Sequence, residues 1–151
     1  MTLTTKETDL LKDLKSQEQL CIDKYTRYSA EACDTGLKTL FDTICQTERT
    51  HLQTVTDILN GAEPHETTSP TATTSVYTGK STCSESSKQS DAYLCRDALA
   101  MEKHVSSVYD TCVFEFSNPK LRDTLAHIQK EEQNHGEQLY TYLAANGMYN
   151  S

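Results

Sequence analysis

The sequence lacks several features that mark common functional classes. Lys and Arg number 14 against 22 Asp and Glu, which gives a formal net charge of −8. No basic stripe is present to neutralise nucleic-acid phosphates, and the negative charge argues equally against an anionic membrane surface. No stretch has the length and hydrophobicity of a membrane-spanning helix, and residues 1–7 contain no apolar core of a signal peptide. We therefore expect neither nucleic acid nor a membrane as a partner.

The six cysteines include no C-x-x-C pair. A zinc or rubredoxin-type iron site built from cysteines alone is therefore not expected. An even number of cysteines without a secretory signal is only weak support for disulfides. We expect reduced thiols for most of the six, with Cys21 and Cys112 as small core residues.

The 151 residues are enough for a single domain with a buried core, spanning residues 1–151. The hydrophobic content is only 36%, but the polar surplus lies largely in the Thr- and Ser-rich stretch 60–90. A connection of that length is unusual inside a compact domain. The flanking parts, about 5–59 and 90–146, are each expected to form a pair of helices.

Four stretches carry apolar residues at alternating steps of three and four. This spacing places the apolar side chains on one stripe of each helix and predicts a four-helix bundle. Terminal signals agree with it: a capping box at Thr4 to Glu7, N-cap residues at Asp34 and Asn118, and a glycine after the second and fourth helices.

The two flanking parts repeat one another at a constant offset along the chain. Glu18, Glu48 and His51 recur as Glu102, Glu132 and His135, and the spacing from the first glutamate to the second is identical in the two copies. A long crossover allows the second and third helices to run parallel, which relates the two pairs by an approximate two-fold axis. We therefore expect an all-α four-helix bundle made of two duplicated helix pairs.

The repeated Glu and His residues all fall on the core stripe, where Leu or Val would be expected. Residues three apart on a helix lie on the same side, so each E-x-x-H motif can bind one metal ion or two adjacent ions. Isolated buried carboxylates are costly, but two divalent cations balance four of them. The pattern predicts two divalent metal ions, with iron expected first and manganese or zinc as alternatives. The predicted ligands are Glu18, Glu48, His51, Glu102, Glu132 and His135. A buried polar network without metal is the alternative that the pattern leaves open.

Two tyrosines also fall on the stripe, seven residues after the first glutamate of each copy. Helical side chains lean toward the N-terminus, so the hydroxyls of Tyr25 and Tyr109 are expected to point toward the site. They either hold the ligand carboxylates by hydrogen bonds, in a supporting catalytic role, or are core aromatics with one polar atom.

Other titratable residues lie off the stripe and are not expected to bind metal. His104 and His127 are predicted at the surface or rim and His65 in the crossover. The remaining three are Glu31 and Glu115, expected near helix ends, and Glu131, beside a predicted ligand.

The two E…E-x-x-H motifs, with a tyrosine seven residues after each first glutamate, resemble the ferritin-like superfamily and within it the rubrerythrin-related and spore coat protein F-like (Coat F) branch. The resemblance implies that Glu48 and Glu132 bridge two metals, that Glu18 and Glu102 are terminal ligands, and that one histidine completes each ion. It also implies that each tyrosine bonds the carboxylate of the opposite half. The chain lacks the C-x-x-C iron domain of rubrerythrins, and with it their built-in electron donor.

Two functions are compatible with these patterns. The first is a di-iron oxidoreductase of the peroxidase or ferroxidase kind, acting on peroxide, oxygen or ferrous iron. The second is a structural spore coat protein with a structural or vestigial metal site, in which Cys83 and the crossover serve assembly or cross-linking. The expected location is the cytoplasm or the spore coat, and the expected partners are a second copy of the chain and other coat proteins.

Overall fold

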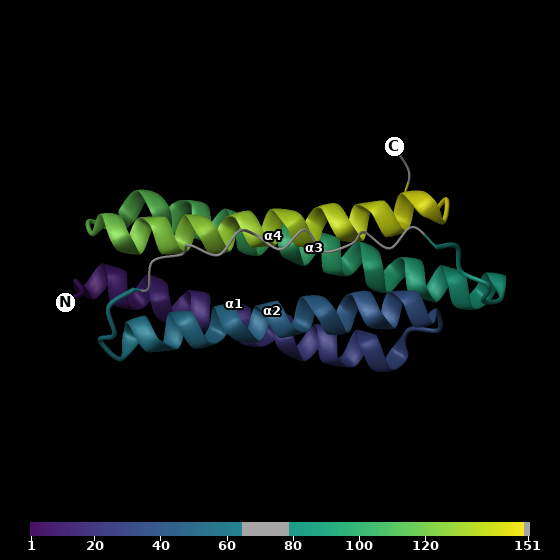
Figure 1. Cartoon of the computed structure of the whole chain (residues 1–151), viewed down its shortest axis with the longest axis horizontal. Helices are drawn as coiled ribbons and strands as arrows, with labels where there is room; N and C mark the ends of the chain where they lie inside the picture. Colours follow the sequence, from purple (N-terminus) through teal and green to yellow (C-terminus); the bar gives the residue numbers. More distant parts are fainter. Residues whose placement is uncertain (65–78, 150–151) are drawn as a thin grey trace.

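The computed structural model describes residues 1–64 and 79–149 (Figure 1). This part of the chain forms four α-helices and no strand: α1 Thr5–Glu31, α2 Thr35–Leu59, α3 Glu85–Glu115 and α4 Pro119–Ala145. The predicted all-α four-helix bundle is confirmed. The boundary near residue 90 was wrong, because Ser84 caps α3 by accepting a hydrogen bond from the amide of Ser87.

The ends of the helices follow the sequence signals. Thr4 and Glu7 form the reciprocal capping box, and the side chains of Asp34 and Asn118 each accept a hydrogen bond from an amide in the first turn of α2 and α4. The glycines that follow α2 and α4 have φ of 90° and 65°, a left-handed conformation that stops a helix at little cost.

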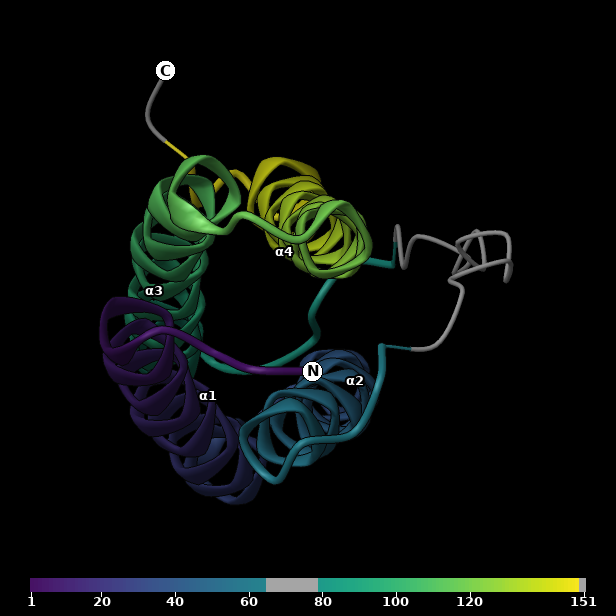
Figure 2. The same cartoon turned by 90° about the vertical axis from the view of Figure 1, so that its left-hand side faces the viewer.

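The helices pack as two antiparallel pairs, α1 with α2 and α3 with α4. Viewed end-on, α1 faces α3 and α2 faces α4 (Figure 2). The helices α2 and α3 run in the same direction along the bundle, since the end of α2 and the start of α3 lie at opposite ends of it (Figure 1). The last residues of α1 and α3 are counterparts in the sequence repeat, and so are the first residues of α2 and α4. The repeat in the sequence is therefore also a repeat in the structure.

Two buried carboxylates near the ends of the bundle tie one helix pair to the other. Glu7 Oε1 accepts a hydrogen bond from the amide of Ser117 at 3.0 Å, and Asp91 Oδ1 accepts one from the amide of Cys33 at 2.9 Å. Both carboxylates and both amides are counterparts in the repeat. The backbone bonds lower the pKa of Glu7, so this carboxyl stays charged at the start of α4, where a helix dipole favours a negative charge.

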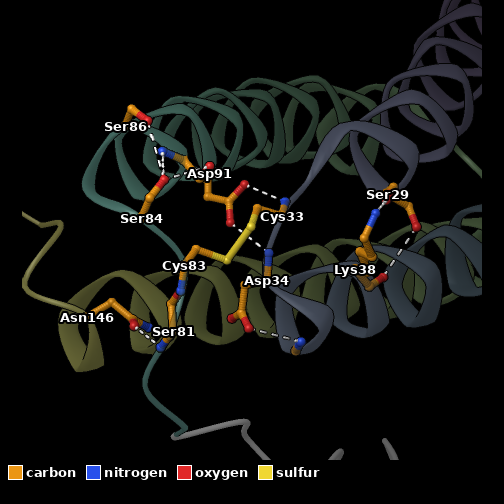
Figure 3. The surroundings of a disulfide bond; sticks show 12 residues. Ser29, Cys33, Asp34, Lys38, Ser81, Cys83, Ser84, Ser86, Asp91 and Asn146 are labelled. Atoms are coloured by element: carbon orange, nitrogen blue, oxygen red, sulfur yellow. Dashed lines mark hydrogen bonds between the residues drawn. A yellow bond between two sulfur atoms is a disulfide. The ribbon is translucent and has the colours of Figure 1, made fainter.

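A disulfide joins Cys33, in the turn between α1 and α2, to Cys83 at the end of the crossover, with Cα atoms 6.5 Å apart (Figure 3). The expectation of reduced thiols for most of the six cysteines is confirmed by Cys21, Cys45, Cys95 and Cys112, which are free and buried. The disulfide-bonded pair is the exception, since pairing cannot be read from sequence alone. In this oxidised form Cys83 is bound within its own chain, which removes the proposed use of its thiol for cross-linking.

Reduction of the disulfide should destabilise the fold. It closes a loop with a sequence separation of 50 residues, for which the chain-entropy estimate is about 4 kcal/mol. We expect urea unfolding of the metal-free protein to shift to lower concentration when a reductant is added. The double variant Cys33→Ser with Cys83→Ser is the control and should not respond to reductant. Equal stability of the oxidised and reduced proteins would show that the bond contributes nothing.

Candidate metal centre

All six predicted ligands meet in the middle of the bundle. Their side chains are buried, with at most 5% of any residue exposed. They come from every helix: Glu18 from α1, Glu48 and His51 from α2, Glu102 from α3, and Glu132 and His135 from α4.

Two of the glutamates lie between the two histidines. His51 Nδ1 is 3.1 Å from Glu48 Oε2 and 2.9 Å from Glu132 Oε1. His135 Nδ1 is 3.0 Å from Glu48 Oε1 and 3.6 Å from Glu132 Oε2. Each of these carboxylates therefore turns one oxygen toward each histidine, the arrangement that a bridging ligand requires.

The other two glutamates each lie beside one histidine. Glu18 Oε1 is 3.7 Å from His51 Nδ1, and Glu102 Oε1 is 3.4 Å from His135 Nδ1. Two groups result, in each of which one possible ligand atom per residue lies within 4.8 Å of the others. The first group contains Glu18, Glu48, His51 and Glu132, and the second contains Glu48, Glu102, Glu132 and His135.

The two tyrosines hold the glutamates that are not shared. Tyr25 Oη donates to Glu102 Oε1 and Tyr109 Oη donates to Glu18 Oε1, both at 2.5 Å. Each bond crosses from one helix pair to the other, as the resemblance implied. Burial and the neighbouring carboxylates raise the pKa of both tyrosines, so their hydroxyls remain protonated donors.

The donor set fits a pair of divalent ions. Within the described part of the chain, Glu18 Oε2, Glu102 Oε2 and Glu132 Oε2 are buried and have no hydrogen-bond partner. A buried acceptor without a partner is costly, and a bound cation would remove that cost. Carboxylate oxygens with imidazole nitrogens are ligands of iron, manganese and zinc.

Without metal, the pKa values of these groups shift in ways that limit the repulsion between the carboxylates. Burial and neighbouring carboxylates raise the pKa of Glu18 and of Glu132. Burial also acts on Glu48, but its hydrogen bonds outweigh it and lower that pKa. For His51 and His135, burial favours the neutral ring, yet hydrogen bonds to carboxylates outweigh it and raise both pKa values. These shifts favour protonation of the two histidines, whose positive charge would offset part of the carboxylate charge in the metal-free centre.

Glu131, which was not expected to bind metal, lies beside the site. Its Oε1 lies 3.4 Å from His51 Nε2, close enough for an ion pair but without hydrogen-bond geometry, and 3.0 Å from His127 Nε2. The contact with His127 could be predicted from the sequence, because residues four apart lie on the same face of a helix. The contact with His51 comes from another helix and gave no signal in the sequence.

The other off-stripe residues lie outside the centre. His104 is exposed, and Glu31 and Glu115 form exposed ion pairs with Arg27 and Lys6. His65 lies outside the described residues.

Residues 90–151 match the Coat F domain family. The match covers α4 and most of α3, fewer than half of the 151 residues, and it confirms the resemblance to spore coat protein F for this part of the chain. It fits a location in the spore coat. Comparisons with curated proteins and with solved structures find no match. No helix in the described residues is long and apolar enough to span a membrane.

The two shared glutamates should matter more for metal binding than the other two. An anaerobic Fe²⁺ titration of the wild type should saturate at two ions per chain, because the group around His51 and the group around His135 can each hold one ion. Glu18→Ala should lose one ion, whereas Glu48→Ala should lose both, since Glu48 contributes to both groups. Equal losses in the two variants would refute the bridging role, and wild-type saturation below one ion would refute the centre.

Metal should reverse the response of stability to pH. In the metal-free protein the raised pKa of His51 and of His135 means that the folded state keeps protons the unfolded chain loses. Stability should therefore fall as pH rises above about 6.5, the ordinary histidine value. The raised pKa of Glu18 acts in the same direction from lower pH. With metal bound, protons compete with the cation, so stability should rise with pH.

Melting temperatures measured with and without Zn²⁺ between about pH 5 and 8 should consequently converge toward acid. Parallel curves would mean that these glutamates and histidines do not form a metal site.

Proposed function

We propose that this chain is a di-metal carboxylate protein, with iron as the resident metal, that acts as an oxidoreductase on peroxide, oxygen or ferrous iron. One observation carries the proposal: two overlapping ligand groups share Glu48 and Glu132 in the core of the bundle. A single structural cation would need only one such group. In this proposal Glu18 and Glu102 are the terminal ligands, and His51 and His135 complete one ion each.

When bound, a pair of ferrous ions supplies two electrons, the number that reduces one peroxide to water. The protein supplies the buried environment in which this electron transfer would take place. Tyr25 and Tyr109 hold the two terminal carboxylates through protonated hydroxyls, whereas no tyrosine in the described residues bonds Glu48 or Glu132. The described core excludes water from most of the centre, which strengthens every charge interaction inside it.

A structural role in the spore coat is the second candidate, and the match to the Coat F domain family is the observation that favours it. In that role the metal pair would only stabilise the bundle. Binding to the folded state raises stability by mass action whether or not any chemistry follows. The two candidates therefore agree on metal binding and differ on turnover.

Oxidation of the ferrous form separates them. The protein is loaded anaerobically with two Fe²⁺ per chain and mixed with hydrogen peroxide or with oxygen in a stopped-flow spectrophotometer. We expect bound iron to be oxidised faster than free Fe²⁺ under the same conditions, with two Fe²⁺ consumed per peroxide. Glu48→Ala is the control and should oxidise iron no faster than buffer. Tight binding of two ions with no acceleration would reject the oxidoreductase and leave the structural role.

A further inference from the structure

A groove of about 370 Å³ opens on the α3 and α4 face of the bundle, beside the metal centre. Glu102 and Glu132 form part of its lining, and each carries a buried carboxylate oxygen without a hydrogen-bond partner in the described structure. Leu99, Tyr140 and Tyr149 provide much of the remaining wall. The groove therefore connects the solvent with the part of the centre that includes these two glutamates.

Gly136 in α4 helps to leave this space open. A glycine inside a helix costs about 1 kcal/mol relative to alanine. Its φ is not positive, and a Cβ added here would meet only Leu99 Cδ1, at 3.6 Å, which is ordinary contact. Neither backbone conformation nor close packing therefore requires a glycine. Its effect is the missing side chain in the lining of the groove.

The repeat shows what a filled groove looks like. The counterparts of Gly136 and Ser106, both of which line the groove, are Leu52 and Ile22. Ile22 is buried with 3% exposure, and Leu52 is partly buried against the core. The first helix pair thus carries aliphatic side chains at the two positions where the second pair has Ser106 and Gly136.

Two aromatic rings line the groove. Tyr140 and Tyr149 pack edge to face, with ring centroids 4.8 Å apart. The segment after α4 is held in place because Arg96 Nε donates to the carbonyl of Met148 at 3.1 Å. This contact places Tyr149 beside the groove, where the residue remains 38% exposed to solvent.

We propose that the groove binds a small uncharged organic molecule whose oxygen-bearing end reaches Glu102 and Glu132. Its volume is more than ten times the share of about 30 Å³ that a water molecule takes in the liquid, so neither hydrogen peroxide nor a metal ion needs it. The apolar walls suit a hydrocarbon body, and outside the two glutamates of the centre the charges of Lys103 and Glu137 offset each other. Alkyl and aryl hydroperoxides belong to this class. The inference rests on the proposed function and names its substrate class.

Binding is tested with 2-phenyl-2-propanol, an alcohol with the shape of an aryl hydroperoxide and no redox reactivity. It is titrated calorimetrically into metal-free and zinc-loaded protein. We expect saturable binding to the wild type, weakened by about tenfold or more in Gly136→Leu, which restores the residue type of the first helix pair. Gly136→Ala is the matched comparison, because it improves helix propensity but adds only one methyl group to the lining; its affinity should stay above that of Gly136→Leu.

Ser106→Ile provides a second, independent block should Gly136→Leu fail to fold. Unchanged affinity in a folded blocking variant, or no saturable binding by the wild type, would overturn the groove proposal. The zinc content of every variant is measured in parallel. Normal zinc content without alcohol binding rejects only the groove, whereas a wild type that binds no zinc rejects the metal centre as well.

Discussion

Mutual compensation of charge in the core is the constraint on which the rest of this structure depends. Four carboxylates without cations would repel one another, and burial removes them from the screening of the solvent. The histidines offset this repulsion through Nδ1 atoms placed between the glutamates, and the tyrosines do so by donating across the bundle. Since each ligand has its partners on other helices, the centre exists only when all four helices are in register.

The ends of the bundle help to set that register. Glu7 and Asp91 reach from one helix pair to the backbone of the other, and these buried charged acceptors tolerate little displacement. The disulfide adds a covalent attachment at one end by fixing the crossover to the turn between α1 and α2 (Figure 3). Loss of these contacts would displace the candidate ligands, because a small axial shift of α2 or α4 moves both residues of an E-x-x-H motif together.

Much of the fold and the positions of the six candidate ligands could be predicted from sequence because both follow helical periodicity. A polar residue on an apolar stripe is a strong signal, and its recurrence at the matching position of the second copy is stronger. Contacts made by side chains off the stripe carried no such signal. The contact of Glu131 with His51, the pairing of Cys33 with Cys83 and the groove beside Gly136 all depend on which helices become neighbours. Periodicity within one helix contains no information about that.

The two halves of the centre are not equivalent although their ligands repeat. On one side His51 has Glu131 behind its outer nitrogen, and the counterpart of Glu131 in the other copy is Thr47, which carries no charge. At 3.4 Å the Glu131 carboxylate attracts the outer ring nitrogen of His51 by charge, although the pair lacks hydrogen-bond geometry. On the other side, Glu102, the partner of His135, lines the groove. In the proposed function, these differences in the surrounding residues would adapt one half to holding an ion and the other to meeting a substrate.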